Sequence, residues 1–197
     1  MYIAPPPDSE ATARLYQSSL DGQGFVMNLT RAWAWRPEVF EAFAALRSQL
    51  TEHSSLSKRE LAVLVCATAS ELGDSYCALA WGKTLAGLSD PALAAAVLQS
   101  QAGAGLTPRD QALSSWARKL VDDPNRTTAA DVASLRAAGL SEREIAEATL
   151  FVAFRLAFST VNDALGVQPD WQVAAAAPKE VAAAVTFGRP VAPRLAY

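Results

Sequence analysis

The feature that most constrains the fold is the run from Leu61 to Ala69, in which every residue but Thr68 is apolar. Ser57-x-x-Glu60 precedes it and has the pattern of a capping box, in which each side chain accepts a hydrogen bond from the other residue's backbone N–H. Gly73 follows as a helix stop. Because a helix that is apolar on nearly every side is buried, the run predicts a central helix between Ser57 and Gly73.

A second predicted helix follows directly. Asp74 or Ser75 can cap it, its first turn carries Tyr76 and Cys77, and Trp81 comes one turn later. A helix N-terminus stabilises negative charge by roughly 0.3–1 kcal/mol at an exposed site. Since the thiolate is the reactive form of cysteine, this is where the chain would place a reactive thiol.

The remaining pattern indicates an all-α fold. Alanine is abundant and β-branched runs are scarce, which favours closely packed helices. Caps, stops and apolar spacing predict further helices at 9–20, after 24–26, and at 37–50, 90–98, 107–120, 128–139, 141–165 and 179–185. The first is expected to end at Asp21-Gly22. The predicted core face of 37–50 consists of Val39, Phe40, Phe43, Leu46 and Leu50. In total we predict roughly eight to ten helices.

The chain is expected to divide into two regions. Residues 1–166 form the helical domain, and 167–197 form a tail that packs on this domain or on a neighbouring subunit. The tail residues that favour packing are Trp171, Val181, Phe187 and Tyr197. Short loops are predicted at 51–55, 101–105 and 122–126.

Composition excludes several classes of function. The net charge is −3 and no basic face is visible, which argues against nucleic-acid binding. There is neither a signal-peptide pattern nor an apolar stretch long enough for a membrane span, so a soluble cytoplasmic protein without membrane contact is expected. His53 is the single histidine and lies in a polar loop, so we expect neither a metal site nor a cofactor. Two cysteines do not make a disulfide framework.

Several short sequence segments, taken in their order and spacing, resemble one known family. They are Gly24-Phe25-Val26-x-Asn28-Leu29, Arg36-Pro37-Glu38-Val39, Leu56-Ser57-x-Arg59-Glu60-Leu61, Tyr76-Cys77, the stretch from Ala130 to Ser141, Asn162-x-x-Leu165-Gly166-Val167, and Ala184-Val185-x-Phe187-Gly188-Arg189-Pro190. With them, almost the whole chain resembles the AhpD-like superfamily, which includes alkylhydroperoxidase D and carboxymuconolactone decarboxylase, and in particular its peroxidase-related branch.

The resemblance implies an all-α, AhpD-like bundle that assembles with itself, from dimer to hexamer. It also implies an antioxidant oxidoreductase chemistry. Active members carry Cys-x-x-Cys at a helix start, a histidine four residues after the second cysteine, and a glutamate on the preceding helix. The second cysteine reduces the peroxide, the first resolves the product as a disulfide, and the glutamate and histidine relay protons.

This chain departs from that pattern. Cys77 matches the second cysteine, but Asp74 replaces the first and Trp81 replaces the histidine. Glu60 stands in the matching phrase, about two residues further from Cys77 than the family spacing, and Glu71 is a substitute by position only. Glu60 is also explained by its capping box alone and Asp74 by an N-cap. The candidate catalytic residues are therefore Cys77, Glu60, Asp74 and Trp81.

The replacements disfavour a reactive thiol. A carboxylate at Asp74 raises the pKa of a neighbouring thiol, and the indole of Trp81 donates one hydrogen bond but accepts none, so it cannot relay a proton. Without the first cysteine, oxidised Cys77 would need an external thiol or Cys66 to resolve it. Cys66, in the middle of an apolar helix, is expected to be a small buried hydrophobe.

Three functional hypotheses remain. The first is a one-cysteine thiol peroxidase that reduces a hydroperoxide with an external thiol. The second is a non-catalytic member that acts as an oligomeric scaffold or as a binder of a small apolar ligand. The third and most distant is a lactone lyase or decarboxylase, for which the sequence offers no suitable histidine at the site.

Overall fold

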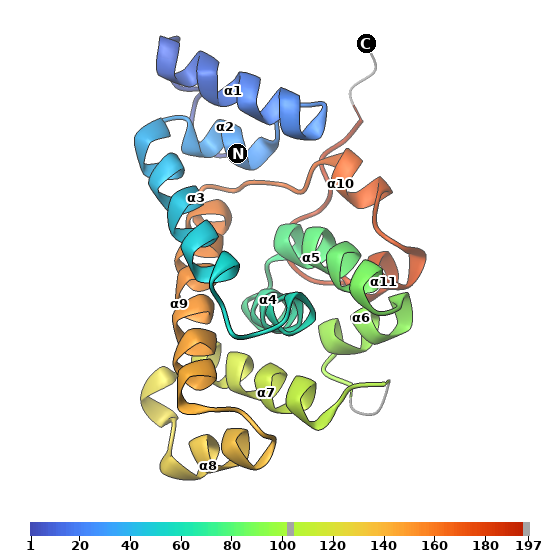
Figure 1. Cartoon of the computed structure of the whole chain (residues 1–197). Coiled ribbons are helices and arrows are strands. Elements are labelled where there is room, and N and C mark those ends of the chain that lie inside the picture. The colour runs from blue at the N-terminus through green and yellow to red at the C-terminus, as the bar shows by residue number, and fades with distance from the viewer. Residues whose placement is uncertain (102–104, 195–197) are drawn as a thin grey trace.

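The computed structural model describes residues 1–101 and 105–194, and this part of the chain contains eleven α-helices, one 3-10 turn and no strand. The elements are α1 (Glu10–Gln23), α2 (Asn28–Trp33), α3 (Pro37–Glu52), α4 (Lys58–Leu72), α5 (Ser75–Leu88), α6 (Pro91–Leu98), α7 (Pro108–Asp122), η1 (Pro124–Arg126), α8 (Ala129–Ala137), α9 (Glu142–Ala164), α10 (Trp171–Ala175) and α11 (Lys179–Ala184). The predicted all-α class is confirmed (Figure 1).

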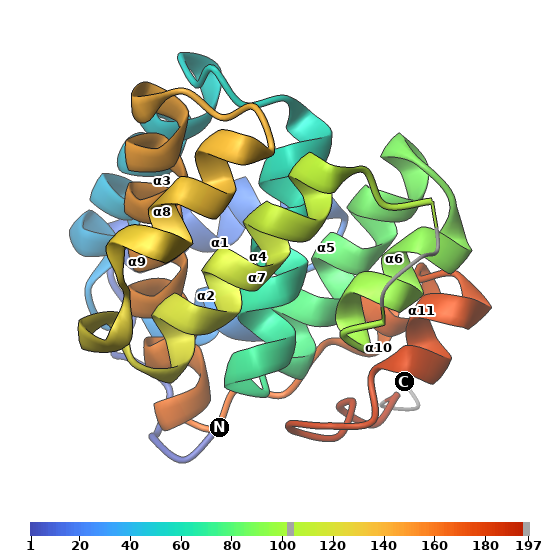
Figure 2. The ribbon, with the colours of Figure 1, turned by 90° about the horizontal axis from the view of Figure 1, so that it is seen from below.

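Helix α4 is the centre of the molecule. Every residue from Leu61 to Ala69 is buried, as the apolar run predicted. The helix contacts α5, α6, α7 and α9, which surround it in Figure 1. Seen from below, α7 lies across α4, and α6 and α11 cover one side of the bundle (Figure 2). Burial of a whole helix explains why no polar stripe interrupts the run.

Local signals set most helix ends. Complete capping boxes are present at Ser57/Glu60, Thr107/Asp110, Thr128/Asp131 and Ser141/Glu144. Helix α4 ends at Gly73, which has a left-handed φ of 82°. The predicted end of the first helix at Asp21-Gly22 is wrong, because α1 continues to Gln23 and stops at Gly24, which has a φ of 79°.

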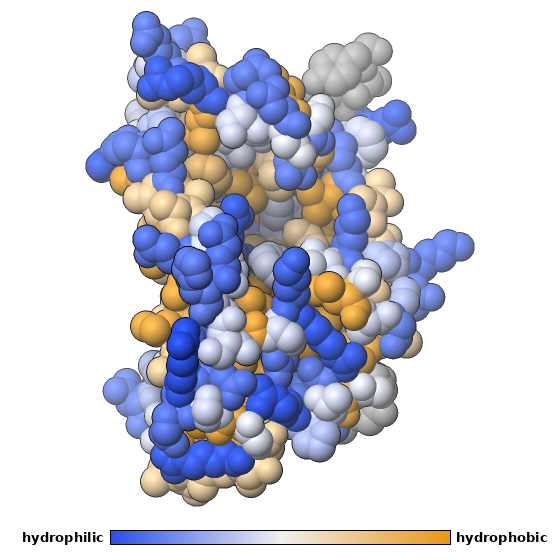
Figure 3. Space-filling model, viewed as in Figure 1, coloured by the Kyte–Doolittle hydropathy of each residue, from blue (hydrophilic) through white to orange (hydrophobic). Residues whose placement is uncertain are grey.

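The predicted core face of α3 is confirmed in part, because Phe40, Phe43 and Leu50 pack against buried core residues. No residue of α3 is fully buried, and Leu46 is 43% exposed. Helices α1, α2 and α3 stand at one edge of the bundle (Figure 1). Residues of these three helices line a hollow together with residues of α5 and α9, and the hollow is visible on the surface in Figure 3. Two residues of the stripe, Phe40 and Phe43, also line this hollow.

The tail packs on the helical body. Val181 and Ala184 of α11 are buried, and α11 contacts α5 and α6. Helix α10 was not predicted. Tyr197 and part of the predicted loop at 101–105 lie outside the described residues. Among the helices of the described part, none combines the length and the apolar character that crossing a bilayer requires.

Candidate functional site

A cavity of about 500 Å³ lies between the α1–α3 edge and the bundle, and the sulfur-bearing residue Cys77 is part of its wall. Figure 3 shows the hollow on the molecular surface, with hydrophobic residues around it. We call it the Cys77 cavity. Its aromatic lining residues are Phe40, Phe43, Tyr76, Trp81, Phe154 and Phe158. The volume falls in the range of small-molecule sites.

Cys77 lies in the first turn of α5, as predicted. The chain reverses at Gly73, and Asp74 then caps α5 by accepting the backbone N–H of Cys77 on Oδ1 at 2.9 Å. The tail fixes this turn, since Ser75 Oγ donates to the carbonyl of Arg189 at 2.8 Å. A Cβ on Gly188 would lie 2.3 Å from the carbonyl oxygen of Gly73. A side chain at Gly188 would therefore displace the turn that presents Cys77.

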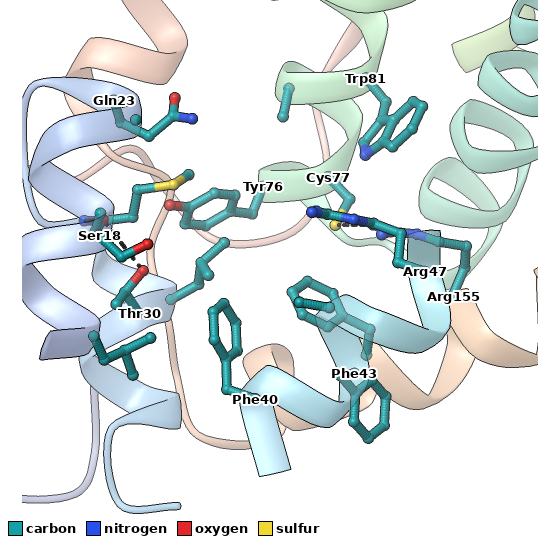
Figure 4. A pocket seen from close by; sticks show the side chains of 18 of the residues that line it. Ser18, Gln23, Thr30, Phe40, Phe43, Arg47, Tyr76, Cys77, Trp81 and Arg155 are labelled. Atoms are coloured by element: carbon teal, nitrogen blue, oxygen red, sulfur yellow. Dashed lines mark hydrogen bonds between the residues drawn. The ribbon is translucent and has the colours of Figure 1, made fainter. Parts of the chain in front are cut away.

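Arg155 on α9 is the principal partner of the thiol. Its Nη2 donates to Sγ of Cys77 at 2.9 Å, and Ser159 Oγ lies 3.7 Å from the same sulfur. The guanidinium also lies over the rings of Trp81 and Phe158, 5.5 and 5.1 Å from their centroids. Figure 4 shows Arg155 next to Cys77, below the indole of Trp81.

Arg155 is nearly buried, with 4% of its surface exposed, and its Nε has no hydrogen-bond partner. In the part of the chain that the structure describes, no carboxylate oxygen lies within 4.0 Å of it. A buried guanidinium that is always charged needs an anionic neighbour. The sulfur of Cys77 is the atom in position to serve as that anion when the thiol ionises.

The electrostatic effects on Cys77 oppose one another. Burial raises the pKa of the thiol, and the Asp74 carboxylate raises it further, whereas Arg155 and Ser159 lower it. The net direction is upward. The sequence prediction that Asp74 would hold the thiol in its neutral form therefore agrees with the structure, and Arg155 is the opposing charge that the sequence reasoning missed.

The structure brings together three of the four predicted site residues. Asp74, Cys77 and Trp81 share the start of α5, and Trp81 lines the cavity with Cys77. Arg155 and Ser159 complete the group from α9. One signal could have identified Arg155: it is the only charged residue between Glu147 and Asp163.

Glu60 does not belong to this group, which contradicts its prediction as a catalytic residue. It lies in the first turn of α4, about 18 Å along the helix axis from the end near Cys77. Its carboxylate accepts hydrogen bonds from Ser57 and from Arg109 Nε at 2.7 Å. The capping-box interpretation accounts for it fully. Glu71, the positional substitute, pairs instead with Arg118 at 3.0 Å.

The other candidates lie outside the cavity wall. Cys66 is completely buried in α4, and burial raises the pKa of its thiol to about 12. Both cysteines are free. His53 is exposed at the end of α3. Within residues 1–101 and 105–194, no group of three or more His, Cys, Asp or Glu residues is arranged to hold a metal ion.

No protein-family model matches the chain, and no curated protein matches it. Solved structures do. An uncharacterized peroxidase-related protein from Silicibacter sp. TM1040 is 26% identical, with a TM-score of 0.73 over 86% of this chain and 88% of that one. An uncharacterized peroxidase-related protein from Ralstonia eutropha JMP134, described as an alkylhydroperoxidase AhpD core, is 23% identical, with a TM-score of 0.75 over 94% and 97%.

The debrominase Bmp8 has the same fold, with 14% identity and a TM-score of 0.74 over 92% of this chain and 98% of that one. A variant of Bmp8 in complex with 2,3,4-tribromopyrrole gives a TM-score of 0.72 at 15% identity. At identities this low, the structural similarity establishes a common fold. The resemblance seen in the sequence is thus confirmed at the level of the fold: the chain has the AhpD-like helical fold and is similar in structure to these peroxidase-related proteins.

Proposed function

We propose that the protein is a thiol-dependent hydroperoxide reductase that uses Cys77 as its single nucleophile. One observation carries the proposal: Cys77 lies on the wall of a cavity of small-molecule size, and its sulfur accepts a 2.9 Å hydrogen bond from a buried arginine. A guanidinium in this position favours the thiolate over the thiol. It can also donate to oxygen atoms that approach the sulfur.

The reaction would begin with the thiolate of Cys77 attacking the terminal oxygen of a hydroperoxide. An S–O bond forms and the O–O bond breaks, so the sulfur is oxidised to sulfenic acid and the peroxide is reduced to an alkoxide. Negative charge develops on the departing oxygen, and Arg155 is the nearby cation that can stabilise it. The alkoxide then takes a proton from solvent, because Trp81 cannot act as a proton relay.

Two external thiols would restore the enzyme. The first attacks the sulfenic sulfur, releasing water and leaving a mixed disulfide on Cys77. The second attacks the mixed disulfide, releases the external disulfide and regenerates the thiolate. Cys66 is a poor resolving group, since it is fully buried in α4 and does not line the Cys77 cavity.

The test uses cumene hydroperoxide with dithiothreitol as the external thiol. We expect steady-state peroxide consumption and, when the thiol is omitted, one sulfenic acid per chain at Cys77, detected with dimedone by mass spectrometry. Cys77→Ser should abolish both signals, and Cys66→Ala, which removes the other cysteine and keeps Cys77, serves as the matched control that retains them. Absence of any adduct at Cys77 in the folded wild-type protein under excess peroxide would refute the proposal.

The alternative is a non-catalytic binder of small apolar molecules. The aromatic lining of the Cys77 cavity and the raised pKa of the thiol support it. The same fold in Bmp8 holds a brominated pyrrole. The two functions separate cleanly, because a binder retains ligand affinity in Cys77→Ser, whereas a reductase loses its turnover.

Self-association belongs to the same proposal. We expect a homo-oligomer, between dimer and hexamer, as the family resemblance implies. Size-exclusion chromatography with light scattering measures it directly, and a monomer at micromolar concentration would contradict it.

A further inference from the structure

The Cys77 cavity is positively charged, although the chain as a whole has a net charge of −3. Arg47 and Arg155 both line it, and its described lining residues include no aspartate or glutamate. A second hollow of about 530 Å³ adjoins it, sharing Arg47, Trp81 and Thr84, and adds Lys58, again without a carboxylate. Cations in a cleft with apolar walls concentrate anionic ligands.

Arg47 has no role in the proposed reaction and no partner that explains it. It lies in α3 and is exposed, and among the described residues its guanidinium takes part in no ion pair and no hydrogen bond. Figure 4 shows its side chain extending from α3 into the cavity, toward the region of Cys77 and Arg155. A guanidinium placed this way can bind a carboxylate through two parallel hydrogen bonds.

The buried Arg155 supplies an independent indication. Its Nε is buried and unpartnered although the residue lines the cavity, so the resting site leaves cationic hydrogen-bonding capacity unused. Apolar and aromatic side chains form the rest of the wall near it, including Phe43 and Phe158. The site thus combines a nucleophilic sulfur, an apolar chamber and two guanidinium groups.

We infer that the substrate is an organic hydroperoxide that also carries a carboxylate. Its apolar body occupies the Cys77 cavity, its peroxide group meets Cys77 and Arg155, and Arg47 binds the carboxylate. This inference rests on the proposed function and adds the substrate class to it. Arg47 is then a specificity-determining residue that acts on the substrate and not on the sulfur.

Binding is tested separately from chemistry. Calorimetry on the wild-type protein compares para-isopropylbenzoate with its neutral amide, neither of which contains a peroxide. We expect the acid to bind at least about tenfold more tightly, and Arg47→Gln to remove that preference. Arg47→Lys should retain part of it, and Arg126→Gln, which removes an exposed arginine outside the cavity, should leave it unchanged.

Turnover provides the second measurement. Para-carboxycumene hydroperoxide and cumene hydroperoxide share one reacting centre, so the ratio of their kcat/KM values reports the carboxylate alone. We expect a ratio of about ten or more in the wild type and in Arg126→Gln, and about one in Arg47→Gln.

The outcomes distinguish the two proposals. Equal affinity for the acid and the amide, or an acid preference that survives in Arg47→Gln, overturns the substrate class even if cumene hydroperoxide is consumed. Loss of all peroxide chemistry with an intact, Arg47-dependent acid preference overturns the reductase and leaves the carboxylate site standing.

Discussion

Two polar clusters lie at opposite ends of α4, and they are built in opposite ways. At its N-terminus, Arg109 donates to Glu60 and Glu144, both at 2.7 Å, and to the carbonyl of Gly139 at 2.6 Å. Nearby, Arg59 binds Asp110 at 2.6 Å. Each of these carboxylates also completes a capping box. The same carboxylates thus serve as helix caps and as partners in ion pairs. As a result, the charged groups of this cluster are all paired.

The cluster beyond the C-terminus of α4 is incompletely paired. In the described part of the chain, the buried side-chain atoms without a hydrogen-bond partner are Asp74 Oδ2, Arg155 Nε, Asn162 Nδ2 and Arg189 Nε. They belong to the start of α5, the second half of α9 and the tail. Unsatisfied buried polar atoms cost stability. The contrast supports a structural role for the paired cluster and agrees with the proposal that the residues around Cys77 form the functional site.

The largest expected effect comes from Arg155→Met. Removing the guanidinium should lower the rate of Cys77 with cumene hydroperoxide about 100-fold. The free energy of unfolding should change by about 1 kcal/mol or less, because an apolar side chain replaces a buried charge. Stopped-flow peroxide kinetics and urea denaturation measure the two quantities. An unchanged rate would remove Arg155 from the mechanism.

The reverse pattern is expected for Arg109→Met. This change leaves Glu60 and Glu144 without their cation, so the free energy of unfolding should fall by about 2 kcal/mol. The peroxide rate of the folded protein should stay within about twofold of the wild type, since Arg109 does not line the Cys77 cavity. A large loss of rate with intact stability would break the contrast between the clusters.

Asp74→Asn tests how the charge of Asp74 affects the Cys77 thiol. Asparagine keeps the N-cap hydrogen bond to Cys77 but removes the negative charge that, after burial, raises the pKa of the thiol. The alkylation rate of Cys77 by iodoacetamide at pH 7 should rise about tenfold, and its pH profile should shift to lower pH. A slower reaction would show that Asp74 assists the thiol.

The smallest effect is expected for Asp163→Asn. Burial first, and the nearby Asp74 second, raise the pKa of Asp163 to about 7. Its unfolded pKa is about 3.9, so the folded state binds the proton more tightly and stability falls as pH rises from about 4 to 7. The variant should raise Tm at pH 8 by about 2 °C and weaken that pH dependence.

The control for this last measurement is Asp122→Asn, which changes an aspartate in an exposed pair with Arg126. Surface pairs of this kind contribute little, so its Tm should equal that of the wild type at pH 8. A fall in Tm for Asp163→Asn would mean that the carboxylate at that position is stabilising when ionised.

The sequence predicted the helices more completely than it predicted the candidate site. Ser57 with Glu60, and Ser141 with Glu144, identified two helix starts because a capping box involves residues three apart. The stripe of α3 was predicted to face the core, and Phe40 and Phe43 both pack on core residues and line the Cys77 cavity. An amphipathic pattern shows that a face avoids water, and it does not say whether that face meets a core or a cavity.

By itself, the sequence determined the all-α class, the buried central helix, and the place of Cys77 with Asp74 before it and Trp81 after it. These depend on local propensities and on residues within one turn of each other. The tertiary structure decided the partner of the sulfur: Arg155 lies 78 positions further along the chain, and packing of α9 against α4 brings it to 2.9 Å. It also removed Glu60 from the site, because a rigid helix separates that carboxylate from the thiol.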